Sequence, residues 1–161
     1  MSADRKRLRE LGLRVGRFPA GERSAIVDVP GVRVGHRTLA DELTGVTAIL
    51  PHGGNLYEDN VAGACHVVNG YGKAAGLSQL TELGTLESPI LLTNTLAVGA
   101  AWEGGLRHAL DRSPEAARDR DTVNVVVAEC FDGWLSDARA LHVRPEHALE
   151  AIATALSLIH I

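Results

Sequence analysis

The sequence predicts an α/β fold, in which helices pack on a sheet within one domain or part of one. Short runs rich in Val and Ile, separated by Pro and Gly, recur through the first 95 residues, and such runs are typical of strands. Residues 95–110 and 145–159 instead place apolar side chains at three- and four-residue steps, which is the helical period. Residues 122–131 form a near-continuous apolar run, which indicates a central strand covered on both faces.

The other strand segments are bounded by turn residues. Residues 24–38 hold two β-rich runs divided by Pro30 and the glycine after it, and residues 45–54 add a run that ends in Pro and Gly. Residues 63–72 predict a strand that ends in glycines, and residues 88–95 predict a further strand whose last residues can cap a helix. We therefore expect an open sheet built mostly in the first half of the chain.

The helical segments follow these strands. Thr95 is a suitable N-cap for a helix that continues to about Leu110. The face of this helix that we expect to be buried carries Val98, Ala101, Trp102, Leu106 and Ala109. Residues 112–121 are polar and dense in charge, so they predict a solvated surface loop.

A second amphipathic helix begins with Pro145 and Glu146, which suit a first helical turn. Its apolar stripe consists of Leu149, Ile152, Leu156 and Ile159. Neither a Gly or Asn C-cap, nor a basic last turn, nor a proline follows this stripe. We therefore expect the chain to be part of a longer protein.

Composition excludes several classes of function. The chain has 161 residues, 45% of them hydrophobic, and this is enough for one globular domain with a core. Its net charge of −4 argues against binding to nucleic acid or to an anionic membrane, each of which needs a basic patch. The charged N-terminus is unlike a signal peptide, and no apolar run reaches membrane-spanning length, so we expect a cytoplasmic protein.

The spacing of the remaining motifs does not by itself indicate a catalytic, cofactor or metal site. The segment GYGKAAG misses the dinucleotide-binding spacing by one residue, and the histidines and cysteines lack ligand spacing, so neither a cofactor nor a metal is expected. Cys65 and Cys130, each within an apolar stretch, are expected to be buried free thiols. Glu129 and Asp132 flank a strand end, where they form either a general acid/base pair or, as we favour, the caps of a turn.

A resemblance to a known family implies a fold and a function that motif spacing alone does not indicate. The sequence resembles the N-terminal half of the DmpA family, the L-aminopeptidase/D-esterase and β-aminopeptidase group of peptidase family S58. The similar phrases, which span about residues 11–155 in the family's order, are AIVDVPGVRVGH, TGVTAILPHG, VVNGYGKAAGLSQLTELGTLESPILLTNTLAVG and VVAECFDGWLSDARALHVRPEHALEAI. The resemblance implies part of a four-layer αββα sandwich similar to that of N-terminal-nucleophile hydrolases and of the ornithine acetyltransferases.

The implied function is that of a self-cleaving serine aminopeptidase or amidase. In the family, a precursor cuts itself before a serine, whose new amine and hydroxyl then attack small peptides, amides or esters. That serine and an oxyanion-hole asparagine are expected beyond residue 161, so this chain is expected to contain no catalytic residue and to be inactive by itself. Residues 1–161 then form a single incomplete domain, whose tail from about residue 156 departs from the family pattern, as translated sequencing-adapter sequence would. The implied partners are the missing C-terminal portion, a small peptide or amide substrate, and further copies of the complete protein.

Four residues of this chain are candidates for the substrate pocket, and all are assigned by the resemblance. Phe131 matches an aromatic position, often tyrosine, that helps to hold the reacting carbonyl oxygen, and it lacks the hydroxyl. Lys73 follows the Asn-Gly pair that begins at Asn69, in a turn where the family commonly has a glutamate suited to the ammonium of the substrate. Asn94 matches a motif near the wall of the active site, although capping of the following helix explains it equally well. The alternative function is a non-catalytic module that binds a small molecule or a partner through the strand ends at Asn69, Asn94 and Phe131.

Overall fold

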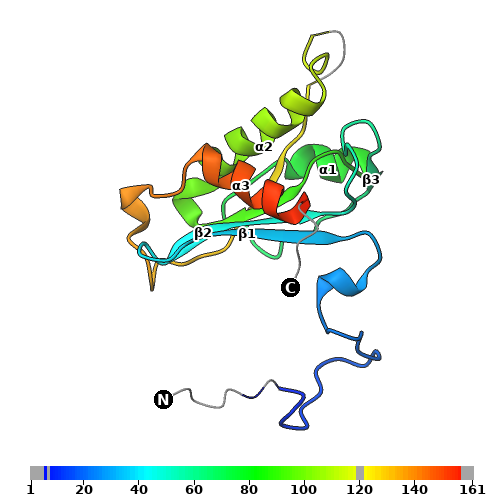
Figure 1. Cartoon of the computed structure of the whole chain (residues 1–161), viewed down its shortest axis with the longest axis vertical. Helices are drawn as coiled ribbons and strands as arrows, with labels where there is room; N and C mark the ends of the chain where they lie inside the picture. The colour runs from blue at the N-terminus through cyan, green and yellow to red at the C-terminus, as the bar shows by residue number, and fades with distance from the viewer. Residues whose placement is uncertain (1–5, 7, 119–121, 157–161) are drawn as a thin grey trace.

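The computed structural model describes residues 6, 8–118 and 122–156 of the chain. Helices α2 and α3 lie on one side of a five-stranded sheet, and the segment before β1 lies on the other side (Figure 1). In chain order the elements are η1 (Ile26–Asp28), β1 (Arg33–Leu39), β2 (Thr44–Leu50), β3 (Val61–Ala62), β4 (Ala74–Ala75), α1 (Leu77–Leu83), β5 (Thr85–Leu86), β6 (Ile90–Thr93), η2 (Thr95–Ala97), α2 (Val98–Arg112), β7 (Val126–Glu129), η3 (Ala138–Ala140) and α3 (Pro145–Leu156).

The main sheet has the strand order β1-β2-β6-β7-β4, and a separate small sheet joins β3 to β5. Strands β6 and β7 run parallel, whereas β1 with β2, β2 with β6 and β4 with β7 are antiparallel. The helix α2 therefore serves as the crossover between two parallel neighbours, as expected for an α/β unit. Because β2 runs against β6, the first residues of β2 lie at the same edge as the carboxyl ends of β6 and β7.

The core lies between the sheet and the two long helices. In β2 the side chains of Val46, Ala48 and Leu50 are buried and alternate with half-buried neighbours, which is the period of a strand with one fully covered face. They belong to one cluster with Leu91 of β6 and Val127 of β7, and with small residues of both helices. The apolar character predicted for these strands therefore forms a core of aliphatic side chains.

Small residues allow the helices to approach closely. A Cβ atom on Gly35 of β1 would overlap with the backbone of α3 at Ala151 and Ala155. A Cβ atom on Gly104 of α2 would overlap with the carbonyl oxygen of Pro145, at the start of α3. The position of α3 therefore depends on the absence of side chains at two glycines, one in the sheet and one in the neighbouring helix.

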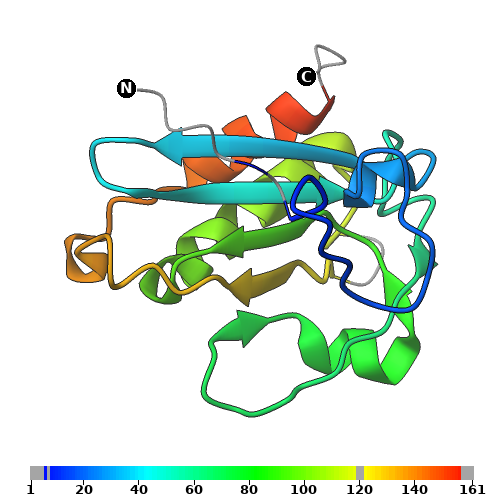
Figure 2. The same cartoon turned by 90° about the horizontal axis from the view of Figure 1, so that it is seen from below.

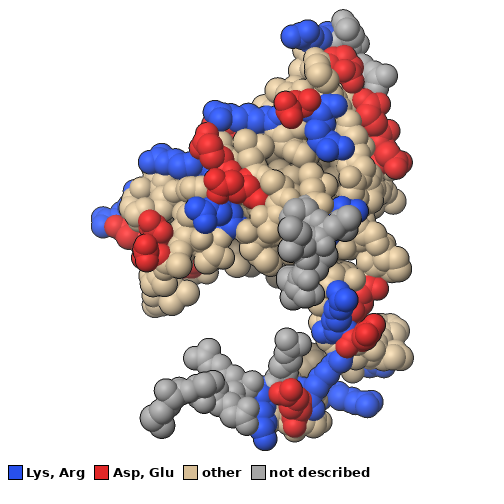
Figure 3. Space-filling model, in the orientation of Figure 1, with Lys and Arg blue, Asp and Glu red and all other residues tan. Residues whose placement is uncertain are grey.

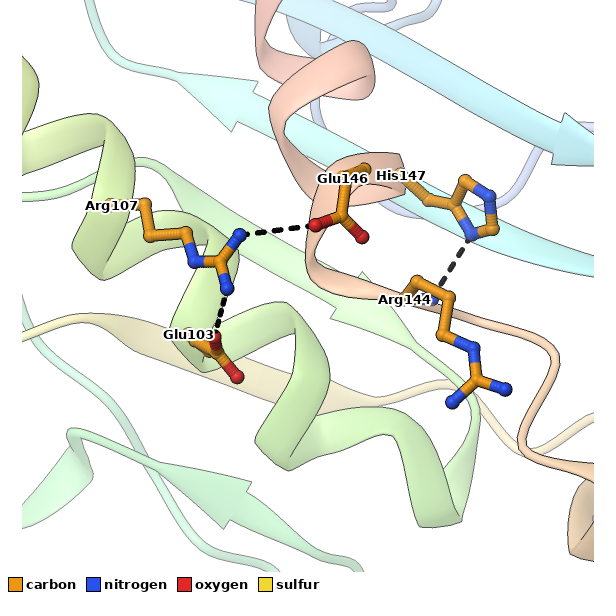
Figure 4. Close-up of polar contacts among 5 residues, drawn as sticks. All are labelled: Glu103, Arg107, Arg144, Glu146 and His147. Carbon is orange, nitrogen blue, oxygen red and sulfur yellow. Dashed lines mark hydrogen bonds and ion pairs between the residues drawn. The ribbon is translucent and has the colours of Figure 1, made fainter.

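Polar contacts hold the N-terminal end of α3 against α2 (Figure 4). The guanidinium of Arg107 in α2 pairs with Glu103 one turn earlier and with Glu146 in the first turn of α3, at 3.0 Å. A ring nitrogen of His147 accepts a hydrogen bond from the backbone N–H of Arg144, which precedes the helix, at 3.0 Å. This contact corresponds to one half of a capping box, and an acidic residue in the first turn complements the helix dipole.

The other end of α3 is bound by a side chain from the first strand. Nη1 of Arg33 donates a hydrogen bond to the carbonyl oxygen of Leu156 at 3.2 Å. Arg33, which is far away in the sequence, therefore caps the last described turn of α3.

The face of the sheet opposite α2 and α3 is only partly covered (Figure 2). The strand register places His36, Thr47, Leu92 and Ala128 in one row across this face, from β1 to β7. His36 is exposed and the other three are half-buried, and a ring nitrogen of His36 lies 2.9 Å from the hydroxyl of Thr47. Helix α1 covers the sheet farther along, where Leu80 packs with Val126. This face therefore offers a mixed apolar and polar surface to a further layer.

Charged side chains are distributed without a dominant sign over the helical side. Acidic and basic groups are interspersed over α2 and α3 on the face drawn in Figure 3, and several of them form ion pairs. This arrangement is unlike the basic stripe that a nucleic-acid surface needs. Within the described ranges, none of the helices combines the length and the apolar character needed to cross a membrane.

Several predicted elements are confirmed and two strand predictions are wrong. Strands are present at β1, β2, β6 and β7, and helices are present at α2 and α3. The β-rich run before Pro30 instead forms the short helix η1, where the carboxylate of Asp28 accepts the backbone N–H groups of Arg23 and Ala25. Residues 63–70 form no strand, and Val67 and Val68 are exposed there, because the short pairing of β3 with β5 ends at Ala62.

Some predictions for single residues also need correction. Thr95 is not the N-cap, because the side chain of Asn94 accepts the backbone N–H of Ala97 and so caps η2, from which α2 continues. Trp102 is 37% exposed rather than buried. The close contacts of α2 lie instead at Gly104 and Gly105, where a Cβ atom would overlap with neighbouring residues. Cys130 is exposed rather than buried, and Cys65 is half-buried, although both are free thiols as expected. In the second helical stripe, Leu149 and Leu156 are half-buried, Ile152 is buried, and Ile159 lies outside the described residues.

Candidate functional site

The candidate site lies at the edge of the sheet where β6 and β7 end. The backbone N–H of Cys130 donates to the carbonyl oxygen of Thr93 at 2.7 Å, which extends the parallel pairing to the last residues of both strands. Asn94 follows one strand and Phe131 follows the other, so the register brings these two candidates to the same edge. Such an edge is where open α/β sheets commonly place functional groups.

Glu129, the last residue of β7, contributes a carboxylate to this edge. Its Oε2 atom accepts the backbone N–H of Lys73 at 2.7 Å, and its own N–H donates to the carbonyl oxygen of Lys73 at 3.1 Å. The N–H of Lys73 is the main cause that lowers the pKa of Glu129 below its ordinary value. The half-buried carboxylate is therefore ionised near neutral pH and available to a cation.

Lys73 lies beside Glu129, but its ammonium group contacts another residue. Nζ donates to the carbonyl oxygen of Tyr71 at 2.9 Å and lies 4.8 Å from the centre of the Tyr71 ring, within cation–π distance. Asn69 is exposed, and its side-chain oxygen accepts the N–H of Tyr71 at 3.1 Å, as in an Asx turn. The loop from Asn69 to Lys73 is therefore held by its own hydrogen bonds and leads directly into β4.

Phe131, two residues after Glu129, provides an exposed aromatic surface. Its ring contacts that of Trp134 edge to face, with centroids 6.4 Å apart and planes at 89°. Phe131 is 60% exposed and Trp134 is 90% exposed. A Cβ atom on Gly133 would overlap with the ring of Phe131, so the glycine permits this ring position. The pair can contact an apolar group but cannot donate an O–H hydrogen bond.

A buried polar network lies beneath the same strand ends. Nδ2 of Asn94 donates to the hydroxyl of Thr44 at 2.8 Å, and this hydroxyl donates to Oδ2 of Asp132 at 2.5 Å. The backbone carbonyl of Asp132 also accepts the N–H groups of Leu135 and Ser136, at 2.8 and 3.0 Å. The backbone of Asp132 therefore holds a turn, while its carboxylate binds Thr44 and that of Glu129 binds the N–H of Lys73, so neither carboxylate caps the turn as we expected from the sequence.

The four sequence candidates thus have different surroundings. Glu129 accepts the N–H of Lys73 and precedes Phe131 by two residues, whereas Asn69 is four residues before Lys73 in the adjoining loop. Asn94 is buried, and its side chain caps η2 and binds Thr44, so it supports the edge from below. Sequence reasoning assigned Glu129 no part in binding substrate and did not identify Thr44. The strand-end position signalled Glu129, but nothing near Thr44 in the sequence indicates its contact with Asp132.

The donor set does not resemble a metal centre. Within the part of the chain that the structure describes, no three His, Cys, Asp or Glu side chains are grouped so that they could hold a metal ion. The strand-end segments contribute one carboxylate, one aromatic pair and backbone amides to this edge. They are suited to contact an organic cation that carries an apolar substituent.

The fold defines the class of protein. The structure matches the PH0078 protein of Pyrococcus horikoshii OT3 with a TM-score of 0.87 and 46% identity, over 92% of this chain and 45% of that chain. It matches the L-aminopeptidase D-Ala-esterase/amidase of Ochrobactrum anthropi, described as a prototype of the serine aminopeptidases and a variant of the Ntn hydrolase fold, with a TM-score of 0.79 and 31% identity. That match covers 92% of this chain and 44% of the other. The chain therefore has part of the four-layer αββα fold, and its described residues supply the main sheet, the small β3–β5 sheet, and the helices α2 and α3 that cover one face of the main sheet.

The sequence identifies the family within this class. The model of peptidase family S58 matches residues 24–158, so the chain belongs to that family. The beta-peptidyl aminopeptidase BapA of Sphingosinicella microcystinivorans is 36% identical over 167 aligned residues, which cover 97% of this chain and 41% of BapA. The chain thus spans about two fifths of the length of the curated relatives that it matches.

Proposed function

We propose that the chain is the N-terminal portion of a self-cleaving serine aminopeptidase or amidase that acts on small peptides, amides or esters. The observation that carries this proposal is the family match over residues 24–158, together with an ionised carboxylate at the strand-end edge. The relatives are more than twice as long as this chain, so the nucleophilic serine and the oxyanion asparagine are expected in the remaining portion. Residues 1–161 are then one incomplete domain, and this chain is inactive by itself.

Glu129 is the group that we assign to the free amine of the substrate. Its carboxylate is half-buried and ionised, and two residues further along the chain Phe131 begins an exposed aromatic pair that can cover an apolar side chain. An ammonium bound there forms a charge-assisted hydrogen bond, which is stronger than a neutral one. Lys73 weakens the preference for a free amine, because it is positively charged and its own backbone N–H binds the same carboxylate.

Phe131 limits how the reacting carbonyl can be held. Without a hydroxyl it cannot donate to a developing oxyanion, so the donors must come from backbone N–H groups or from the remaining portion of the protein. The partly covered face of the sheet supports a second sheet from that portion as the next layer of the sandwich, since Leu92 and Ala128 are half-buried there. We expect the complete protein to form a homo-oligomer, as the family resemblance implies.

The test is to extend the coding sequence beyond codon 161 and to express the complete protein. We expect purified protein to separate into two chains, the second of which begins with serine, and to hydrolyse aminoacyl anilides or esters. Replacement of that serine by alanine is the matched control, and it should leave a single uncleaved chain without activity. An uncleaved wild-type protein that binds amines but turns over none of these substrates would instead support the non-catalytic binding module.

A further inference from the structure

Three strand ends are tied together below the candidate site by one buried threonine. Thr44, the first residue of β2, is 9% exposed, and its hydroxyl accepts from Asn94 after β6 and donates to Asp132 after β7. Asn94 is itself fixed, because its side-chain oxygen accepts the N–H of Ala97 at 3.1 Å. The series of donors therefore runs in one direction, from the amide through the hydroxyl to the carboxylate.

This contact matters for Asp132 because its side chain has few alternatives. The Oδ1 atom of Asp132 is buried and has no hydrogen-bond partner among the residues that the structure describes. Its Oδ2 atom accepts a hydrogen bond from the hydroxyl of Thr44 at 2.5 Å. A buried carboxylate that loses its only side-chain donor is poorly solvated and tends to move. The orientation of Asp132 therefore depends on Thr44.

Asp132 in turn sets the direction in which the strand-end residues leave the sheet. It follows Phe131 directly, and its backbone carbonyl closes the turn that carries Trp134 by accepting two N–H groups. On the other side, the N–H of Cys130 is bound to the carbonyl oxygen of Thr93. The segment from Glu129 to Asp132 is therefore fixed at both ends, by β6 and by Thr44.

We propose that Thr44 and Asp132 are positioning residues that aim Glu129 and Phe131 at the substrate. This inference rests on the proposed function, because it assigns a role in the same site. The two residues touch no substrate. They act by holding the backbone between β7 and the following turn, and a small displacement of a binding group is enough to reduce turnover strongly.

A matched pair of substitutions tests this role in the complete protein. Thr44→Val removes the hydroxyl and keeps the shape of the side chain, and Thr44→Ser restores the hydroxyl. Thr93→Val is the control: Thr93 is 2% exposed, and its hydroxyl donates to the carbonyl oxygen of Gly45 at 3.0 Å without reaching Asp132. Thr44→Val and Thr93→Val therefore each remove one buried hydroxyl from neighbouring strands, and only the first of these hydroxyls binds Asp132.

The quantity to compare is the ratio of kcat/KM for free-amine substrates to kcat/KM for N-acylated ones. We expect Thr44→Val to lower this ratio by about tenfold or more, and Thr44→Ser to recover most of it. Thr93→Val should leave the ratio within about threefold of the wild type. Equal ratios for Thr44→Val and Thr93→Val, or no recovery with Thr44→Ser, would overturn the proposal.

A second measurement separates this inference from the proposed function. Amide hydrogen exchange should be faster at residues 130–136 in Thr44→Val than in Thr93→Val, whether or not the complete protein is an enzyme. If the protein is inactive but exchange responds in this way, only the proposed function fails. If exchange in that segment is the same in both variants, the positioning role fails.

Discussion

Nη1 of Arg33, the first residue of β1, lies 3.2 Å from the carbonyl oxygen of Leu156, the last described residue of α3. The contact joins the beginning of the sheet to the end of the helix that covers it. It also places a positive charge where the helix dipole is negative, which favours the helix.

Replacement of Arg33 should therefore destabilise the chain. Arg33→Met keeps the aliphatic stem and removes the donors, and we expect it to lower the free energy of unfolding by about 1 kcal/mol. Arg37→Met is the control on the same strand, since Arg37 forms an exposed ion pair with Glu150 and should contribute less, about 0.5 kcal/mol. Urea unfolding measures both values, and an equal loss in the two variants would contradict the capping role.

Gly35 should not tolerate even one methyl group. A Cβ atom there would overlap with the backbone of α3, which cannot move aside as a side chain can, so Gly35→Ala should cost about 1–3 kcal/mol or more. In contrast, Gly99→Ala adds a methyl group to α2 with no neighbouring atom within 4 Å and should stabilise by up to about 1 kcal/mol. Thermal unfolding of both variants is the measurement, and a neutral Gly35→Ala would show that α3 is free to shift.

The 161-residue chain by itself should associate in solution. Half-buried apolar residues such as Leu92 and Ala128 lie on the partly covered face of the sheet, and β1 is an edge strand. Exposed apolar surface and unpaired strand edges promote self-association. Light scattering at increasing concentration should show a rising mean mass together with binding of an apolar dye. A monomer of constant mass that binds no dye would count against this expectation.

Glu129 should determine the preference for a free amine. In the complete protein, Glu129→Gln keeps the size of the side chain and removes its charge, so kcat/KM for free-amine substrates should fall by about tenfold to a hundredfold. N-acylated substrates lack the ammonium and should change much less. Glu129→Asp is the control that retains the charge and should preserve part of the preference. A uniform loss over both substrate classes would indicate a structural role for Glu129.

Lys73 is expected to disfavour free-amine substrates. Two ammonium groups about 4 Å apart repel by about 1 kcal/mol in bulk water, which is about fivefold in binding, and more in a less polar site. Lys73→Glu should therefore raise kcat/KM for free-amine substrates and affect acylated ones little, and Lys73→Gln should give a smaller rise. Because Nζ is bound to the carbonyl oxygen of Tyr71, an absent or equal response would mean that this contact holds the charge away from the substrate.

The periodic elements of the fold were predictable because each has its own pattern. The alternation in β2 and the three- and four-residue steps of α2 and α3 are visible in the sequence, and the structure confirms them. The run at residues 63–70 has a similar β-rich composition but forms no strand. A strand requires a partner as well as suitable residues, and the nearest pairing stops at Ala62.

The candidate site was only partly predictable for a related reason. The position of Glu129 at the end of an apolar strand is visible locally, but its contact with Lys73 depends on the pairing of β4 with β7. The contact of Thr44 with Asp132 joins residues that are 88 positions apart. Because such contacts depend on strand order, composition and spacing in one sequence do not contain them.

The place of β7 between β6 and β4 also affects how this chain is made on the ribosome. Residues 74–75 and 90–93 are synthesised well before residues 126–129, with which both strands pair. At about 5–20 residues per second, the earlier strands wait for several seconds with open hydrogen-bonding edges before their common neighbour emerges. The nascent chain therefore passes through an interval in which these edges lack their common neighbour, and synonymous codons that slow translation between residues 94 and 125 should reduce the yield of native protein.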